Sequence, residues 1–83
     1  MTPDVDVVAT TIVDYLNTHI MAATNRIGPD DLLAPAGVDS MALLKVLVFI
    51  EREYGLWVPD EELTDDVIAS ARTLATYVCR AGP

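Results

Sequence analysis

Residues 37–50 read GVDSMALLKVLVFI, in which a small polar pair, Asp39 and Ser40, precedes ten residues with a single charge, Lys45. A helix formed by this segment has apolar side chains on all of its sides. A surface helix in a small bundle is normally apolar over only about a third to a half of its circumference. A lone serine at the start of so apolar a helix either caps that helix or bears a chemical group.

Helical periodicity continues on both sides of this segment. Three stretches place apolar residues three and four positions apart, and a shorter stretch begins after Pro59 with acidic residues in its first turn. No alternation of period two is long enough to predict a strand. The sequence therefore predicts an all-α fold, a small bundle of three main helices plus one short helix, with helices at about residues 4–20, 40–54, 60–67 and 71–80.

Capping residues mark the ends of the predicted helices. Asp39 or Ser40 can cap the central helix, and Gly55 is well placed to end it. Ser70 can cap the last helix. Residues 21–38 lose the helical periodicity and contain two glycines and two prolines, which predicts a long loop, and loops of this length in small domains are often functional.

The composition indicates one globular domain spanning residues 1–83, because a chain of this length is too short for two cores. The net charge of −8 argues against nucleic acid, whose phosphates require clustered Lys and Arg, and favours a partner with a basic docking patch. The single cysteine, Cys79, excludes an internal disulfide. No signal peptide or membrane-spanning run is present, so we expect a soluble, cytoplasmic monomer without membrane contact.

Two other kinds of site fit the sequence poorly. The segment around Ser40 lacks the second glycine of the G-x-S-x-G nucleophile elbow, and the only histidine, His19, lies on another predicted helix. The acidic stretch 60–66, DEELTDD, lacks the central glycine and the late glutamate of an EF-hand loop. We therefore expect neither a Ser-His-Asp hydrolase nor a calcium site.

The helix over 40–54 cannot be buried on all sides in so small a domain. We expect the residues of this helix that face the core, its core line, to be Met41, Leu44, Leu47 and Tyr54. Val48 or Ile50 is expected beside this line. Part of the surface of three other residues is then left near solvent: Leu43, Val46 and Phe49. This surface either marks a partner site or is covered by the loop residues Leu32 and Leu33.

A serine at a helix N-terminus lies where free backbone N–H groups and the helix dipole favour an anion. A phosphate ester on Ser40 would be electrostatically well placed there. A simple N-cap role predicts the same residue type without any attachment, so the residue types alone leave both interpretations open.

Asp39-Ser40-Met41 resembles the D-S-L attachment motif of acyl carrier proteins and related phosphopantetheine-binding carriers. Residues 51–63, EREYGLWVPDEEL, are similar to the helix end, glycine and proline-acidic segment of this family, and residues 27–40, IGPDDLLAPAGVDS, to its long loop. The resemblance covers nearly the whole chain, up to Val78. It implies a helical fold like that of the acyl carrier proteins.

The resemblance also implies a cofactor and a set of partners. Ser40 would bear covalent 4′-phosphopantetheine, transferred from coenzyme A by a phosphopantetheinyl transferase, and Asp39 would help to present the serine and contact the magnesium ion that the transferase holds. The arm would carry an acyl or aminoacyl group as a thioester between a loading enzyme and a downstream synthase or transferase. The protein itself would be no enzyme and would hold no metal. Contacts with partners are expected at Met41, Lys45, Val48 and Trp57.

The sequence departs from carriers of fatty-acid synthesis next to the serine. Those carriers usually have acidic residues two and five positions after it, where this chain has Ala42 and Lys45. A basic residue at the second of these positions is more similar to peptidyl or aminoacyl carriers. The resemblance therefore favours a free-standing carrier in a polyketide or aminoacyl pathway, with a fatty-acid carrier and an unmodified helical interaction module as the alternatives.

Overall fold

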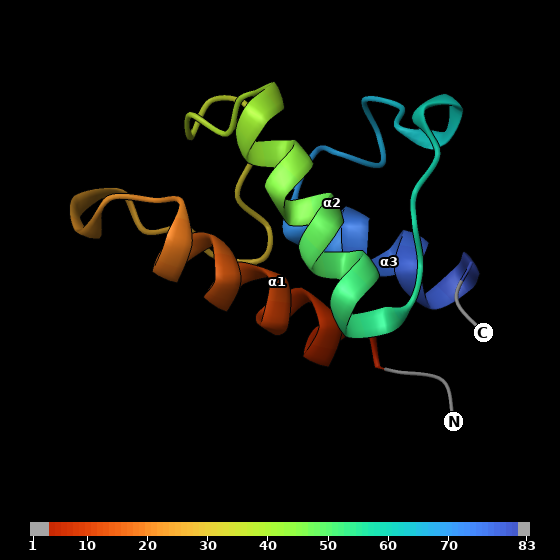
Figure 1. Cartoon of the computed structure of the whole chain (residues 1–83). Helices are drawn as coiled ribbons and strands as arrows, with labels where there is room; N and C mark the ends of the chain where they lie inside the picture. The colour runs from red at the N-terminus through yellow and green to blue at the C-terminus, as the bar shows by residue number, and fades with distance from the viewer. Residues whose placement is uncertain (1–3, 82–83) are drawn as a thin grey trace.

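The computed structural model describes residues 4–81 and consists of helices joined by loops (Figure 1). Its three α-helices are α1 (Val5–His19), α2 (Ser40–Tyr54) and α3 (Ala71–Ala81), and its two 3₁₀-helices are η1 (Ala23–Asn25) and η2 (Asp60–Glu62). The part of the chain that is described contains no strand, and the predicted all-α bundle is confirmed. None of these helices has the length and hydrophobicity needed to cross a membrane.

Apolar stripes of the three helices meet in the core. Along each helix, most fully buried residues recur at intervals of three or four: Val8, Ala9, Ile12 and Leu16 on α1, Val46 and Ile50 on α2, and Ala71, Leu74 and Ala75 on α3. The closest pair of helices is α1 and α3, while α1 approaches α2 less extensively. Buried alanines on both helices of the closest pair are small enough to let the two backbones approach.

The side of α2 that faces the core overlaps only in part with the one that the sequence predicted. Met41 and Leu44, expected in the core line, are 68% and 49% exposed, whereas Val46 is fully buried. The buried residues of α2 are instead Ala42, Val46, Leu47 and Ile50. The prediction was right for Leu47 and for Ile50 beside it, and wrong for Met41 and Leu44, because a helix that is apolar on all sides does not reveal its buried side through its apolar residues alone.

Segment 60–67 is not the short α-helix that the acidic residues after Pro59 predicted. The 3₁₀-helix η2 covers only Asp60–Glu62. A separate turn follows, in which the Val67 N–H donates to the Thr64 carbonyl at 3.0 Å and lies 3.3 Å from the Thr64 hydroxyl. A threonine side chain that bonds the backbone locally in this way competes with continuation of a helix.

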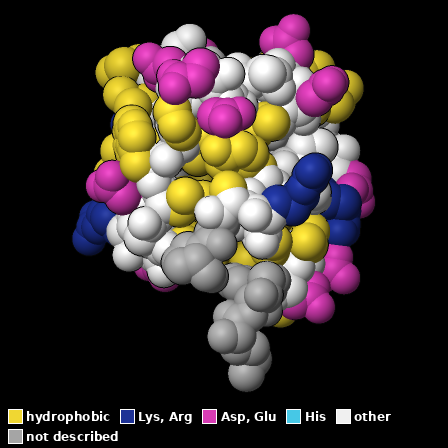
Figure 2. Space-filling model, turned by 90° about the vertical axis from the view of Figure 1, so that its right-hand side faces the viewer, with side chains coloured by type: hydrophobic (Ala, Val, Ile, Leu, Met, Phe, Trp, Pro, Cys, Tyr) yellow, Lys and Arg dark blue, Asp and Glu magenta, His cyan; other side chains and the backbone are white. Residues whose placement is uncertain are grey.

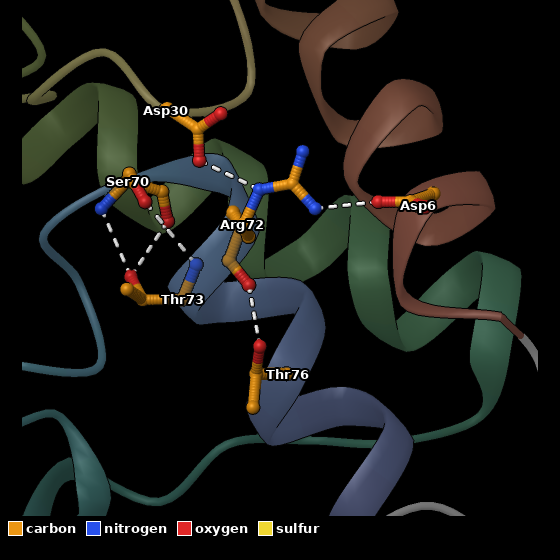
Figure 3. Close-up of polar contacts among 6 residues, drawn as sticks. All are labelled: Asp6, Asp30, Ser70, Arg72, Thr73 and Thr76. Carbon is orange, nitrogen blue, oxygen red and sulfur yellow. Dashed lines mark hydrogen bonds and ion pairs between the residues drawn. The ribbon is translucent and has the colours of Figure 1, made fainter.

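Reciprocal hydrogen bonds fix the N-terminus of α3. The Thr73 N–H donates to Ser70 Oγ at 3.2 Å, and the Ser70 N–H donates to Thr73 Oγ1 at 2.9 Å (Figure 3). This arrangement is a capping box with a threonine at the position where glutamate is usual. The predicted capping role of Ser70 is confirmed.

Arg72, in the first turn of α3, joins three parts of the chain. Its Nε donates to Asp30 Oδ1 in the long loop at 2.6 Å, and its Nη1 donates to Asp6 Oδ1 on α1 (Figure 3). Its backbone N–H also donates to the Pro29 carbonyl at 2.9 Å. The hydrogen bond with Asp6, followed by the one with Asp30, raises the pKa of Arg72, which keeps the guanidinium charged.

Two further contacts hold the loop between α1 and α2. The Asn17 side chain donates to the Ile27 carbonyl at 2.9 Å and accepts the Ile27 N–H at 3.0 Å. The Leu33 N–H donates to the Ala69 carbonyl at 2.9 Å, and the Leu33 side chain is buried. Leu32 points outward and is 59% exposed, so only one of the two loop leucines joins the core.

Candidate functional site

A tight turn leads from the loop into α2. The Gly37 N–H donates to the Ala34 carbonyl at 3.1 Å, and the Val38 N–H donates to the Leu33 carbonyl at 3.0 Å. Gly37 has a φ of +99°, which side chains rarely permit, although a Cβ at this position would meet nothing within 4 Å. The backbone conformation, and not a lack of space, therefore requires glycine here.

Asp39 is the N-cap of α2. Its Oδ1 accepts the Ala42 N–H at 2.9 Å, and its carbonyl accepts the Leu43 N–H at 2.8 Å. Ser40 is the first residue within the helix, and none of the hydrogen bonds among residues 4–81 uses its hydroxyl. Because Asp39 performs the capping, a capping role does not account for Ser40.

The Ser40 side chain is exposed at the N-terminal end of α2, where the helix dipole is positive. The backbone N–H groups of Ser40 and Met41 have no acceptor in the described part of the chain, and the capping oxygen of Asp39, Oδ1, accepts the Ala42 N–H instead. Two free donors and an exposed hydroxyl at a helix N-terminus fit a phosphate ester on Ser40 Oγ.

The outer face of α2 begins one residue after this serine. Met41 and Val48 are 68% and 40% exposed, and Lys45 is also exposed. Their spacings of four and three residues place these predicted partner-binding residues on one side of the helix. Trp57, the fourth of them, is 45% exposed but lies beyond the C-terminal end of α2.

Two residues of this face were not among the predicted partner-binding residues. Leu44 is 49% exposed beside Met41 and Val48, and Arg52 is exposed one turn beyond Val48. The signal that could have identified them is the position of the charges on α2, because charged side chains mark the side of a helix that faces water.

Apolar surface also lies on the side of the molecule that carries the segment after α2. Figure 2 views the structure from the side of that segment and of the C-terminal end of α3, and shows hydrophobic side chains at the surface among acidic ones. The half-exposed Trp57 belongs to this segment.

An apolar cavity of about 260 Å³ adjoins the start of α2. It lies between the long loop, α2 and the segment before α3, and its lining includes Leu32, Leu33, Pro35, Val38, Leu43 and Ile68. Val38 and Leu43 are two and three residues from Ser40, so the cavity opens close to that serine along the chain. Its volume is just below the range of about 300–1,000 Å³ that is typical of sites for drug-sized ligands, and it suits a small apolar group.

A wider and more polar hollow of about 570 Å³ lies between η2 and α3, and its lining includes Glu62, Asp66, Tyr77 and Arg80. Burial, and then the charges of Glu62 and Glu61, raise the pKa of Tyr77, so its hydroxyl stays protonated over a wider pH range. None of the lining residues belongs to α2 or to the segment around Ser40.

The single histidine belongs to an aromatic contact. His19 packs against Tyr15 on α1 with ring centroids 4.9 Å apart, and Tyr15 stacks on Phe49 of α2 at 4.3 Å. His19 is the last residue of α1, as its position in the sequence predicted.

The helical bundle displays an exposed serine hydroxyl, without a hydrogen-bond partner among residues 4–81, at the start of its most apolar helix. Residues 6–78 match the phosphopantetheine attachment site family (PP-binding), and this chain belongs to that family. Its cofactor is 4′-phosphopantetheine, held covalently.

The fold is also found in a solved structure. A chain in the crystal structure of Bradyrhizobium japonicum glycine:[carrier protein] ligase complexed with glycylated carrier protein is similar, with a TM-score of 0.65 and 22% sequence identity. The similarity covers 87% of this chain and 95% of that chain. No curated protein matches the sequence.

Proposed function

We propose that Ser40 Oγ bears the 4′-phosphopantetheine arm and that the protein carries an acyl or aminoacyl group on it for enzymes of a specialised polyketide or nonribosomal-type pathway. The observation that carries this proposal is the exposed Ser40 hydroxyl, which the capping by Asp39 leaves without a structural role. The arm supplies a terminal thiol that holds the group as a thioester. The protein performs no reaction itself and acts in the cytoplasm as a monomer.

The residues next to the serine have distinct parts in this function. A phosphopantetheinyl transferase takes the arm from coenzyme A and provides the magnesium ion. Asp39 uses Oδ1 for the cap, and no described residue hydrogen-bonds its Oδ2, which is therefore free to contact that magnesium. The two free N–H groups at the start of α2 favour the negative charge of the phosphoester.

Two observations favour an aminoacyl cargo, and a third favours an acyl cargo. The fold is shared with a chain of a complex that contains a glycylated carrier protein, and Lys45 and Ala42 stand where fatty-acid carriers usually have acids, which together support an aminoacyl cargo. The apolar cavity beside Val38 and Leu43 supports an acyl cargo instead, so a fatty-acid carrier is the second candidate. A loading enzyme and a downstream synthase or transferase are the partners in either case.

The attachment is tested by the intact mass of the protein after incubation with coenzyme A and a broad-specificity phosphopantetheinyl transferase. We expect the mass to increase by one phosphopantetheine, and Ser40→Ala to abolish the increase. Ser70, the other serine of the chain, is buried, and Ser70→Ala is the matched control that should still be modified. An unmodified wild-type protein, or modification of Ser40→Ala, would contradict the proposal.

The cargo is tested on protein purified from its own cells. The mass on the arm of this protein identifies the group, and an amino acid or a short acyl group is the expected result. A long fatty acyl chain would instead establish the second candidate function.

A further inference from the structure

The loop between α1 and α2 lies against the segment that leads into α3. The Leu33 N–H donates to the Ala69 carbonyl at 2.9 Å. The Arg72 N–H donates to the Pro29 carbonyl at 2.9 Å, so the two segments run antiparallel. Arg72 Nε also donates to Asp30 Oδ1 at 2.6 Å (Figure 3). We call these three contacts the seam.

The seam holds a part of the loop that has few other attachments. We call residues 28–36 the flap. Apart from the seam, the hydrogen bonds of the flap among the described residues stay within the loop. Leu33 is its one buried side chain, whereas Leu32 is 59% exposed. A segment with so little buried apolar surface opens at a lower free energy than the core.

The flap forms part of the wall of the apolar cavity of about 260 Å³. Four of the residues that line this cavity belong to the flap, namely Leu32, Leu33, Ala34 and Pro35, and three belong to the segment before α3, namely Asp65, Ile68 and Ala69. Leu33 and Ala69 are also joined by a hydrogen bond of the seam. The seam therefore ties two parts of the cavity wall to each other.

Both ends of the flap are anchored independently of the seam. Just before the flap, Ile27 forms two hydrogen bonds with the Asn17 side chain on α1. Just after it, the turn at Gly37 leads to Asp39, which caps α2 with its own carboxylate. A few residues at the ends of a segment suffice to absorb a hinge motion. Displacement of the flap is thus compatible with α1 and α2 staying in place.

We propose that the flap opens as a unit when the seam breaks, and that this opening exposes the apolar cavity. The ion pair between Arg72 and Asp30 holds the flap shut, because it is the contact of the seam that depends on charge. The motion controls the access of small apolar molecules to a cavity close to Ser40 along the chain. The proposal goes beyond the carrier function, since the motion needs no arm on the serine.

Hydrogen exchange of backbone amides, followed by NMR, tests the motion. We expect the Leu33 amide to be less protected than that of Ile50, because it exchanges when the flap opens, whereas the buried side of α2 exchanges only in wider unfolding. Rising salt should lower the protection of Leu33 relative to Ile50 by screening the ion pair of the seam. Equal protection of the two amides would overturn the proposal, since the flap would then open only with the whole molecule.

The two aspartates that pair with Arg72 provide a matched comparison, because both are exposed. Asp30→Asn weakens the seam and should lower the protection of Leu33 by about two- to fivefold, the effect of one exposed ion pair, without changing that of Ile50. Asp6→Asn removes the ion pair with α1 instead, and should change the protection of Leu33 by less than about 1.5-fold. Equal effects of the two variants, or no effect of Asp30→Asn, would overturn the proposal.

Access to the cavity is measured with a cysteine placed in its wall. Ala69→Cys is combined with Cys79→Ala, which removes the native thiol, and labelling by N-ethylmaleimide is followed by intact mass. Adding Asp30→Asn should speed the labelling by the same factor as the exchange of Leu33. An unchanged labelling rate would show that the flap does not cover the cavity and would overturn the proposal.

The exchange measurements need no cysteine variant, so they test the proposal even if Ala69→Cys disturbs the fold. None of these measurements involves the Ser40 hydroxyl or the arm. Failure of the proposed function is therefore detected separately, by the mass measurement with coenzyme A and the transferase.

Discussion

The two oxygens of the Asp39 carboxylate have different surroundings. Oδ1 accepts the Ala42 N–H at 2.9 Å and so satisfies one of the free donors at the start of α2, whereas no described residue hydrogen-bonds Oδ2. One oxygen thus stabilises the helix while the other is available to a partner. At the scale of single residues, Asp39 therefore caps α2, and the Ser40 hydroxyl is not needed for capping.

A pair of substitutions at Asp39 separates the two roles. Asparagine can keep the cap but has no charge, so Asp39→Asn should retain the stability of the wild-type protein and slow attachment of phosphopantetheine at Ser40. Asp39→Ala removes the cap as well and should lower the free energy of unfolding by about 0.5–2 kcal/mol. Urea denaturation and a time course of intact mass measure the two effects. An attachment rate for Asp39→Asn equal to that of the wild type would show that the carboxylate charge has no part.

At the scale of helices, α1 and α3 form the tightest contact of the bundle. Ala9 on α1 and Ala75 on α3 are fully buried, and side chains of this size permit a close approach of two helix backbones. At one end of this contact, Arg72 on α3 donates a hydrogen bond to Asp6 on α1 (Figure 3). Because both side chains are fully enclosed, a larger side chain at either position would have to displace its neighbours.

Enlarging a buried alanine in α3 should therefore destabilise the protein. We expect Ala75→Leu to lower the free energy of unfolding by about 1–3 kcal/mol, because the added carbons force neighbouring side chains or the backbone to move. Ala81→Leu makes the same change at the exposed end of α3 and should change it by less than about 0.5 kcal/mol. Chemical denaturation of both variants provides the comparison, and equal stability of the two would show that the α1–α3 contact is loosely packed.

The orientation of α2 follows from its charges rather than from its apolar residues. Three of its four charged residues, Lys45, Glu51 and Arg52, lie within about a third of a turn of one another and opposite the buried Val46 and Ile50. The fourth, Glu53, lies in the last turn of α2 and is exposed. Burying an unpaired charge costs far more free energy than exposing a leucine, so the charged side determines which side faces water.

At the scale of the whole molecule, Arg72 connects the N-terminus of α1, the long loop and the start of α3 (Figure 3). The loop leads into the Gly37 turn and then into Ser40, so its position determines how the serine is displayed. The connection combines two ion pairs with a backbone hydrogen bond to the Pro29 carbonyl. Contacts distant in sequence therefore support the candidate site.

Removal of this connection should have an effect that depends on salt. Arg72→Gln is expected to lower the melting temperature at low salt, and the difference from wild type should shrink between about 0.01 M and about 1 M salt, as the screening length falls from about 30 Å to about 3 Å. Arg80→Gln is the control, because Arg80 is an exposed cation of the same helix without an ion pair among the described residues. A difference that is independent of salt would assign the role of Arg72 to packing.

The sequence by itself determined where the three α-helices lie, because caps, glycines and apolar periodicity act within a few residues of one another. Gly55 ends α2 in the left-handed conformation with a φ of +68°, and the Asp-Ser pair begins that helix, both as predicted. The tertiary structure alone decided that the loop between α1 and α2 is held by Asn17 and Arg72, and that Leu33 rather than Leu32 is buried. These outcomes depend on competition between contacts distant in the chain, such as the 42-residue separation of Asp30 and Arg72, and local residue patterns carry no information about that competition.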